Sequence, residues 1–278
     1  MLDLETIPDE GLVSAVDGEP SRSYADKVDR LLAARRAQTR GRNDFLPLPY
    51  HRPVVACWLE AVERDGALLV ADADAWTDRG APEEEFLEAT WQRLRGRTLV
   101  TFHGRGFDLP VLELRSLKLG LSVHLPGALD RRGPSGEDAR APRVPEEHHD
   151  VMELLSGGGA TPSSSLDLYA KLVGLPGKEG LAGKDVGSLY AVGALEQISS
   201  YCMTDVLRTW LLYLRYRLLD GSLSAAGYSL SVSSCRERLL PLLAGHAGPT
   251  VRAHMAGFLE RCGPFLDELP AQPLRRAL

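Results

Sequence analysis

Two long β-prone runs, Arg52 to Glu63 and Ala67 to Ala73, are separated only by Arg64-Asp65-Gly66. An Asp-Gly pair between two such runs is a strong signal for a tight antiparallel hairpin. The chain is therefore expected to fold around a β-sheet that contains this hairpin.

Strand-like and helix-like segments alternate in the first half of the chain. Residues Leu2 to Ile7 alternate in polarity and are followed by Pro8, which predicts a short N-terminal strand. Pro82 and the three glutamates after it are typical of the start of a helix, which should run to about Arg95. The other predicted elements are a helix at 24–39, a strand at 98–102 and a helix at 109–119. This alternation indicates an α/β fold.

The second half of the chain is expected to be mostly helical. Apolar spacing and glycine stops predict helices at 149–155, 164–173, 195–219, 234–244 and 249–262. The stretch 126–145 has four prolines and three glycines, which is typical of a surface loop or a mobile insertion.

Composition excludes several classes of protein. Over 278 residues, 44% are hydrophobic and 25% are charged, which is ordinary for a globular protein and excludes a disordered or collagen-like chain. Four cysteines without a C-x-x-C pair suggest neither a disulfide framework nor a zinc ribbon. No apolar run reaches the length of a membrane span, and the acidic N-terminus is unlike a signal peptide. We expect a cytoplasmic protein with no membrane association.

Charge limits how the chain binds a polyanion. The formal net charge is −6, and therefore a nucleic acid must be held by local positive patches or by metal ions.

Three short segments carry side chains with possible chemistry. On the first strand, Asp3 and Glu5 are two residues apart, so both carboxylates point to one face, where they can hold a metal ion or simply face solvent. Asp108 follows a glycine-containing turn after a strand, where α/β proteins often bind ligands, although an ordinary helix N-cap explains it equally well. Tyr201 and Asp205 are one helical turn apart, which brings a phenol beside a carboxylate or places a tyrosine in a helix–sheet seam.

In order and in type, these segments resemble the Asp-Glu-Asp-Asp motifs of the DnaQ-like exonuclease superfamily, in its tyrosine version. Finer features narrow the resemblance to the predicted 3′–5′ exonucleases related to the proofreading domain of family B DNA polymerases. The matching runs are at 3–8, 102–110, 149–157, 175–178 and 201–206, within a similarity that covers residues 2 to 225.

The resemblance implies an RNase H-like α/β fold with a mixed sheet of five to six strands flanked by helices. Residues 1–225 would form this domain, with a Pro/Gly-rich loop at about 126–147. Residues 226–278 would form a C-terminal helical extension of unknown role.

The resemblance also implies a function and a site. The chain would be a hydrolase that removes nucleoside 5′-monophosphates from the 3′ end of a nucleic acid, with single-stranded DNA as the favoured substrate. Two divalent cations, Mg²⁺ or Mn²⁺, would be held by four carboxylates, and a tyrosine would orient the attacking water. These catalytic residues are Asp3, Glu5, Asp108, Asp205 and Tyr201. The residues expected to contact the substrate are Thr6, Ile7, His103 and Phe107, the last of which is equally compatible with the core.

Two positions depart from the family pattern. Only Met1 and Leu2 precede Asp3, so either residues lie upstream or the first strand is weakened. His103 stands where the family usually has asparagine. A catalytically inactive nucleic-acid-binding module of the same fold, and an exoribonuclease acting on short RNA, are the alternative functions.

Overall fold

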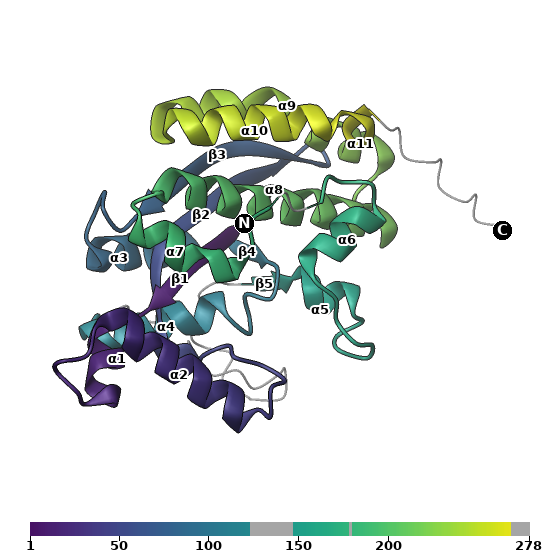
Figure 1. Cartoon of the computed structure of the whole chain (residues 1–278). Coiled ribbons are helices and arrows are strands. Elements are labelled where there is room, and N and C mark those ends of the chain that lie inside the picture. The colour runs from purple at the N-terminus through teal and green to yellow at the C-terminus, as the bar shows by residue number, and fades with distance from the viewer. Residues whose placement is uncertain (123–146, 178–179, 268–278) are drawn as a thin grey trace.

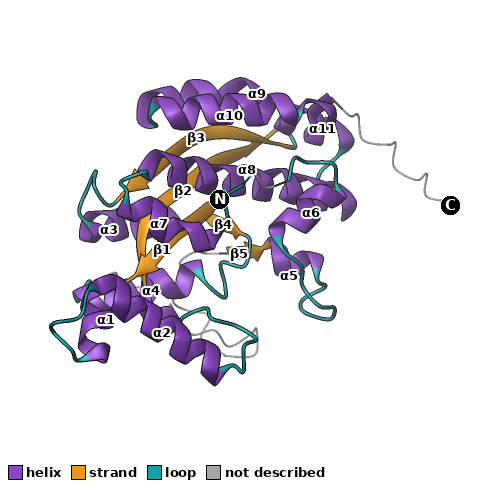
Figure 2. Ribbon diagram, viewed as in Figure 1, coloured by secondary structure: helices purple, strands orange, loops and turns teal. Residues whose placement is uncertain are grey.

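The structure is a computed structural model of the chain, and it describes residues 1–122, 147–177 and 180–267. Helices surround a group of strands at the centre (Figure 2). The strands are β1 (Leu2–Pro8), β2 (His51–Arg64), β3 (Ala67–Thr77), β4 (Thr98–Thr101) and β5 (Glu147–Asp150). The helices of the first half are α1 (Glu10–Asp17), α2 (Tyr24–Gln38), α3 (Glu83–Leu94) and α4 (Asp108–Leu119). The later helices are α5 (Val151–Leu155), α6 (Leu166–Leu172), α7 (Val186–Ala191), α8 (Leu195–Leu219), α9 (Ala225–His246), α10 (Pro249–Arg261) and α11 (Gly263–Asp267). The predicted loop at 126–145 lies outside the described residues.

The predicted hairpin is confirmed and forms most of the larger sheet. Strands β2 and β3 pair antiparallel from Val55 opposite Thr77 to the turn. Asp65 and Gly66 have φ values of 52° and 71°, the left-handed conformations that a two-residue hairpin turn needs.

Strand β1 pairs antiparallel with the other edge of β2. The register runs from Leu2 opposite Trp58 to Pro8 opposite His51. At its start, the Met1 ammonium group donates a hydrogen bond of 2.7 Å to the carbonyl of Leu59. The first strand is thus paired along its whole length, and Asp3 and Glu5 are held by the sheet.

The strands do not join into the predicted sheet of five to six strands. Within the described residues they form a three-stranded sheet, β1-β2-β3, and a two-stranded parallel sheet, β4-β5. Strand β4 lies beside β1, but the N–H of Leu4 donates to the Asp108 carboxylate. The two strands are joined by side chains instead of a ladder, since Leu2 and Leu4 pack in one apolar cluster with Leu99 of β4.

The segment at 147–150 was expected to be a loop running into a helix at residue 149. It is strand β5, which pairs with β4 from Glu147 opposite Thr98 to Asp150 opposite Thr101. Four residues are too few to show a period, and the backbone hydrogen bonds to β4 decide the conformation. Helices α1 and α7 were also not predicted.

Each face of the larger sheet is covered by helices (Figure 1). On one face, Leu2 and Leu4 pack with residues of α3 and α4, among them Phe86, Trp91 and Leu112. On the other face, Ile7 and Cys57 pack with α8 in a larger cluster. Helix α8 therefore lies against the same face of β1 that carries Asp3 and Glu5.

Helix α9 begins nine residues before the predicted 234–244 segment and covers strand β3 (Figure 1). The backbone N–H groups of Leu68 and Val70 donate to the hydroxyls of Ser231 and Ser234, at 2.8 and 3.0 Å. The exposed edge of β3 is thereby satisfied by side chains, which protects it from pairing with another chain. In the part of the chain that the structure describes, no helix is both long and apolar enough to span a bilayer.

Candidate metal centre

The first two expected ligands lie on strand β1. Their donor atoms, together with the thiol sulfur of Cys202 from α8, lie within 4.8 Å of one another. The Cys202 thiol also donates a hydrogen bond of 3.3 Å to the carbonyl of Asp3. The strand alternation that put Asp3 and Glu5 on one face therefore brings both carboxylates against helix α8.

The third expected ligand begins helix α4. Asp108 is only 3% exposed, and its Oδ1 accepts a hydrogen bond of 3.0 Å from the N–H of Leu4. Burial, with a smaller contribution from the neighbouring Asp150 carboxylate, raises the pKa of Asp108 to about 7, although hydrogen bonds from the backbone N–H groups of Asp108 and Leu4 oppose the rise. Asp108 thus reaches the β1 residues across the gap between the two sheets.

The turn before Asp108 is fixed by a buried carboxylate that sequence reasoning placed near the site without a role. Asp150 accepts hydrogen bonds from the backbone N–H groups of His103 and Arg105, at 2.8 and 3.0 Å. His103 has a φ of 66°, and its ring is exposed. The ring packs so closely on Gly106 that a Cβ at that position would lie only 2.6 Å from it. Only the tertiary structure shows this function of Asp150, since nothing local links residue 150 to residue 103.

Helix α8 supplies the last two expected residues. Asp205 is buried, and its Oδ1 accepts a hydrogen bond of 3.0 Å from Arg208. Tyr201 lies one turn earlier, half-buried on the wall of a small cavity of about 270 Å³ between α8 and α10. Sequence reasoning did not single out Arg208, although an arginine three residues after the aspartate is an i, i+3 partner.

Electrostatic interactions show that these carboxylates lie close together. The pKa of Asp3 is raised well above its usual value, first by burial and then by repulsion from Asp108, Glu5 and Asp205. Burial, followed by the charges of Asp205, Glu5 and Asp3, also raises the pKa of Tyr201, so its hydroxyl is neutral.

This donor set fits divalent cations. Buried carboxylates that repel one another are stabilised when a cation lies among them, and oxygen ligands suit Mg²⁺ and Mn²⁺. The residues that would hold such ions are Asp3, Glu5, Asp108 and Asp205.

An aromatic cluster lies next to these residues. The ring of His51 is 4.7 Å from the ring of Phe45 and 5.1 Å from that of Phe107. Its Nδ1 lies 2.8 Å from the Thr6 hydroxyl. Phe45 is 48% exposed, so the cluster presents an aromatic surface to solvent. Neither Phe45 nor His51 was singled out by motif reasoning. The sequence signal for Phe45 is its place directly after the polar residues 38–44.

Ile7, also expected to contact the substrate, lies on β1 beside Thr6. Its side chain is 7% exposed and packs in the core cluster beneath α8. Ile7 follows the alternation of β1, which puts it on the face that carries Asp3 and Glu5, and its contact with the substrate stays a prediction.

Two adjacent histidines on β5, His148 and His149, contact protein groups. Nε2 of His148 lies 2.8 Å from the Thr101 hydroxyl, and burial lowers the pKa of His148 to about 4. Nδ1 of His149 lies 2.7 Å from the hydroxyl of Tyr213. Both imidazoles thus contribute to packing around β5.

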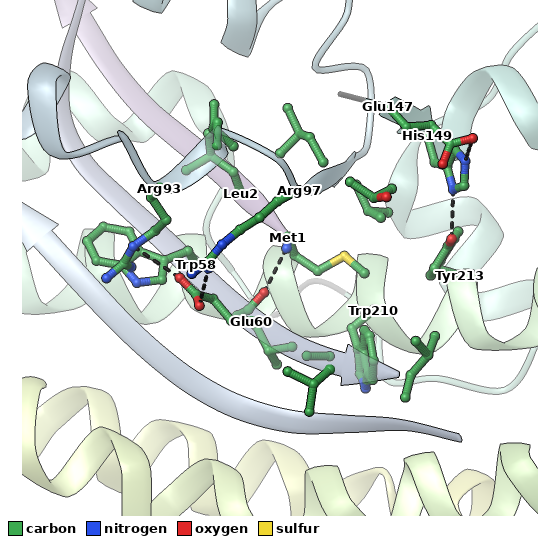
Figure 3. A pocket seen from close by; sticks show the side chains of 18 of the residues that line it. Met1, Leu2, Trp58, Glu60, Arg93, Arg97, Glu147, His149, Trp210 and Tyr213 are labelled. Carbon is green, nitrogen blue, oxygen red and sulfur yellow. Dashed lines mark hydrogen bonds and ion pairs between the residues drawn. The ribbon is translucent and has the colours of Figure 1, made fainter. Parts of the chain in front are cut away.

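The larger of the two cavities described lies elsewhere. Its volume is about 1050 Å³, and it is lined by residues at the starts of β1, β4 and β5 and at the end of α8 (Figure 3). Glu60 forms ion pairs there with Arg93 and Arg97, and Trp210 forms part of the wall. None of the four carboxylates lines this cavity.

No curated protein matches the chain in sequence. Residues 43–262 match a family described as predicted 3′-5′ exonuclease related to the exonuclease domain of PolB. The match includes Asp108, Tyr201 and Asp205 and begins after Asp3 and Glu5. It extends through α9 and α10, beyond the end of the resemblance at residue 225, and covers well over half of the chain. The chain therefore belongs to this family of predicted 3′-5′ exonucleases.

Proposed function

We propose that this chain is a metal-dependent 3′–5′ exonuclease of the tyrosine subtype that releases nucleoside 5′-monophosphates from single-stranded DNA. The observation that supports the proposal most strongly is the position of Asp3 beside three carboxylates that come from β1, α4 and α8. Its pKa is raised first by burial and then by repulsion from these three groups. Such a cluster is costly unless cations occupy it.

The four carboxylates would bind two divalent cations. When bound, the cations supply charge stabilisation for the attacking and leaving oxygens of the phosphodiester. The protein keeps the carboxylates in place through the β1 ladder, the Leu4–Asp108 hydrogen bond and the Asp205–Arg208 ion pair.

Tyr201 is suited to orient water and unsuited to act as a base. Its pKa is raised by burial and by Asp205, so the phenol keeps its proton at neutral pH. A neutral hydroxyl held one turn from Asp205 donates a hydrogen bond to the water that attacks the terminal phosphodiester.

The aromatic cluster supports a single-stranded substrate. Unpaired bases stack on aromatic rings with little dependence on sequence, which suits an enzyme that degrades any strand. We assign Phe107, with Phe45 beside it, to stacking at the 3′ end, and Thr6 and His103 to polar contacts with the terminal nucleotide.

The function is tested with oligonucleotides labelled at the 5′ end. Wild type in Mg²⁺ or Mn²⁺ should give a ladder shortened from the 3′ end, and a blocked 3′ end should prevent it. Asp205→Ala should abolish the ladder, and Tyr201→Phe should slow it by roughly 10²-fold or more. Asp29→Ala removes an exposed carboxylate on α2 and should leave activity unchanged.

Assays of DNA and RNA oligonucleotides under the same conditions identify the preferred polymer. Faster degradation of short RNA would make RNA the substrate instead of DNA. Binding of nucleic acid without hydrolysis in either metal would contradict it and would favour a non-catalytic module.

A further inference from the structure

Arg208 is a buried arginine within reach of the metal centre. It lies on α8, three residues after Asp205, and is 2% exposed. Its Nη1 donates a hydrogen bond of 3.0 Å to Oδ1 of Asp205. One carboxylate oxygen of an expected metal ligand is therefore occupied by a protein cation.

Two other segments fix the guanidinium group. Nε and Nη2 of Arg208 both donate to the carbonyl of Pro176, at 3.2 and 2.9 Å. The group also lies 5.3 Å from the ring centroid of Phe258 on α10. A planar guanidinium with contacts in three directions cannot rotate freely, and neither can the carboxylate bonded to it.

We propose that Arg208 is a positioning residue that holds Asp205 in the orientation needed for metal binding and connects helix α10 to the metal centre. This inference rests on the proposed function, because it concerns a ligand of the same centre. Arg208 engages Oδ1 of Asp205 and thereby restricts the rotation of that carboxylate. Removing a residue that hydrogen-bonds and orients a metal ligand typically lowers metal affinity 10- to 100-fold.

A purely electrostatic role and a positioning role of Arg208 predict opposite changes in cation affinity when this residue is removed. If Arg208 acted only as a charge, its removal would leave a more negative site and tighten the binding of a cation. If Arg208 positions Asp205, its removal weakens binding although the site becomes more negative. The sign of the change in affinity therefore distinguishes the two roles.

The experiment measures Mn²⁺ affinity by electron paramagnetic resonance titration of the whole chain without nucleic acid. Arg208→Met should bind Mn²⁺ about 10- to 100-fold more weakly than wild type. Arg208→Lys keeps the charge but replaces the planar guanidinium and its three bonds to Asp205 and Pro176 with a compact ammonium group, and it should also bind more weakly. Should the methionine variant fail to fold, the lysine variant provides the test.

A matched control lies on the same helix. Arg215 is 4.5 Å from the Phe265 ring and 5.1 Å from the Tyr228 ring, in the part of α8 remote from Asp205. Arg215→Met should lower thermal stability without changing Mn²⁺ affinity. If it weakens Mn²⁺ binding as much as Arg208→Met does, the effect is general loosening of α8 and the inference fails.

The link to α10 is tested at Phe258. Phe258→Leu removes the ring beneath the guanidinium and should weaken Mn²⁺ binding by less than Arg208→Met does. Arg261→Met, whose guanidinium lies 5.9 Å from the same ring, should not change it.

Unchanged or tighter Mn²⁺ binding by Arg208→Met or Arg208→Lys would overturn the inference. It would leave the proposed function intact, provided that wild type binds Mn²⁺ and degrades the oligonucleotide. Absence of Mn²⁺ binding by wild type would overturn both.

Discussion

The N–H of Leu4 donates a 3.0 Å hydrogen bond to Oδ1 of Asp108, joining two residues that are 104 positions apart. A backbone group that would otherwise pair with a neighbouring strand instead holds the first side chain of α4. The gap between β1 and β4 is thus closed at this point by an expected metal ligand. The position of the Asp108 carboxylate therefore depends on the position of strand β1.

Asp108→Asn should stabilise the metal-free protein while abolishing nuclease activity. An asparagine keeps an acceptor for the Leu4 N–H but removes a buried charge whose pKa is raised to about 7 by desolvation. That shift corresponds to at most about 4 kcal/mol at alkaline pH, and we expect a gain of roughly 2 kcal/mol at pH 8. Urea unfolding of wild type and variant in EDTA measures this difference in the free energy of unfolding. Lower stability of the variant at pH 8 would contradict the role assigned to burial.

Mn²⁺ should raise the melting temperature more at pH 8 than at pH 5. The folded-state pKa of Asp108, about 7, lies above its ordinary value of 3.8, so the folded protein binds the extra proton between these values. Stability of the metal-free protein therefore falls as pH rises through this window. Protons also compete with Mn²⁺ for the carboxylates, so Mn²⁺ stabilises the folded protein more as these protons dissociate. Thermal scans with and without Mn²⁺ give the comparison, and an equal shift at both pH values would disprove the linkage.

Removing the two serine hydroxyls that cover β3 should destabilise the fold. Ser231→Ala and Ser234→Ala leave the buried N–H groups of Leu68 and Val70 without acceptors, at a cost of about 1 to 3 kcal/mol each. Ser229→Ala is the control, because that hydroxyl bonds only the carbonyl of Ala225 within its own helix. Chemical denaturation of the three variants tests this, and equal stability of all three would show that the edge contacts contribute little.

Phe45→Ala should raise the KM for single-stranded DNA several-fold and leave kcat nearly unchanged. The ring is exposed and stacks 4.7 Å from His51 beside Phe107, so its loss removes stacking surface but no reacting group. A stacked base contributes about 1 to 3 kcal/mol, which sets the upper limit of the effect. Phe45→Trp should restore binding. Leu219→Ala, which removes another exposed apolar side chain, should have no effect. A fall in kcat alone for Phe45→Ala would rule out a stacking function.

Local patterns were sufficient where the physical cause is local. The Asp-Gly turn fixed the β2–β3 hairpin because both residues adopt left-handed φ values there. Helix α8 follows the predicted bounds, since its apolar spacing runs without a break from 195 to 219. The alternation in β1 correctly put Asp3 and Glu5 on one face, opposite Leu2 and Leu4.

Non-local contacts account for what the patterns missed. Strand β5 exists because four residues pair with β4, and α9 is longer than predicted because its first turns cover β3. The single sheet predicted from the resemblance is divided into two in the described residues, and where they separate the Leu4 N–H bonds Asp108 instead of a neighbouring strand.

The sequence by itself determined the types, order and local geometry of the side chains expected at the metal centre, because strand and helix periods decide which residues share a face. Tertiary structure alone decided what holds those side chains. Asp150 fixes the turn before Asp108, and Arg208 fixes Asp205 by contacts with Pro176 and Phe258. These partners are separated along the chain by 32 to 50 residues. Their contacts depend on how the helices pack around the sheet, which no local pattern encodes.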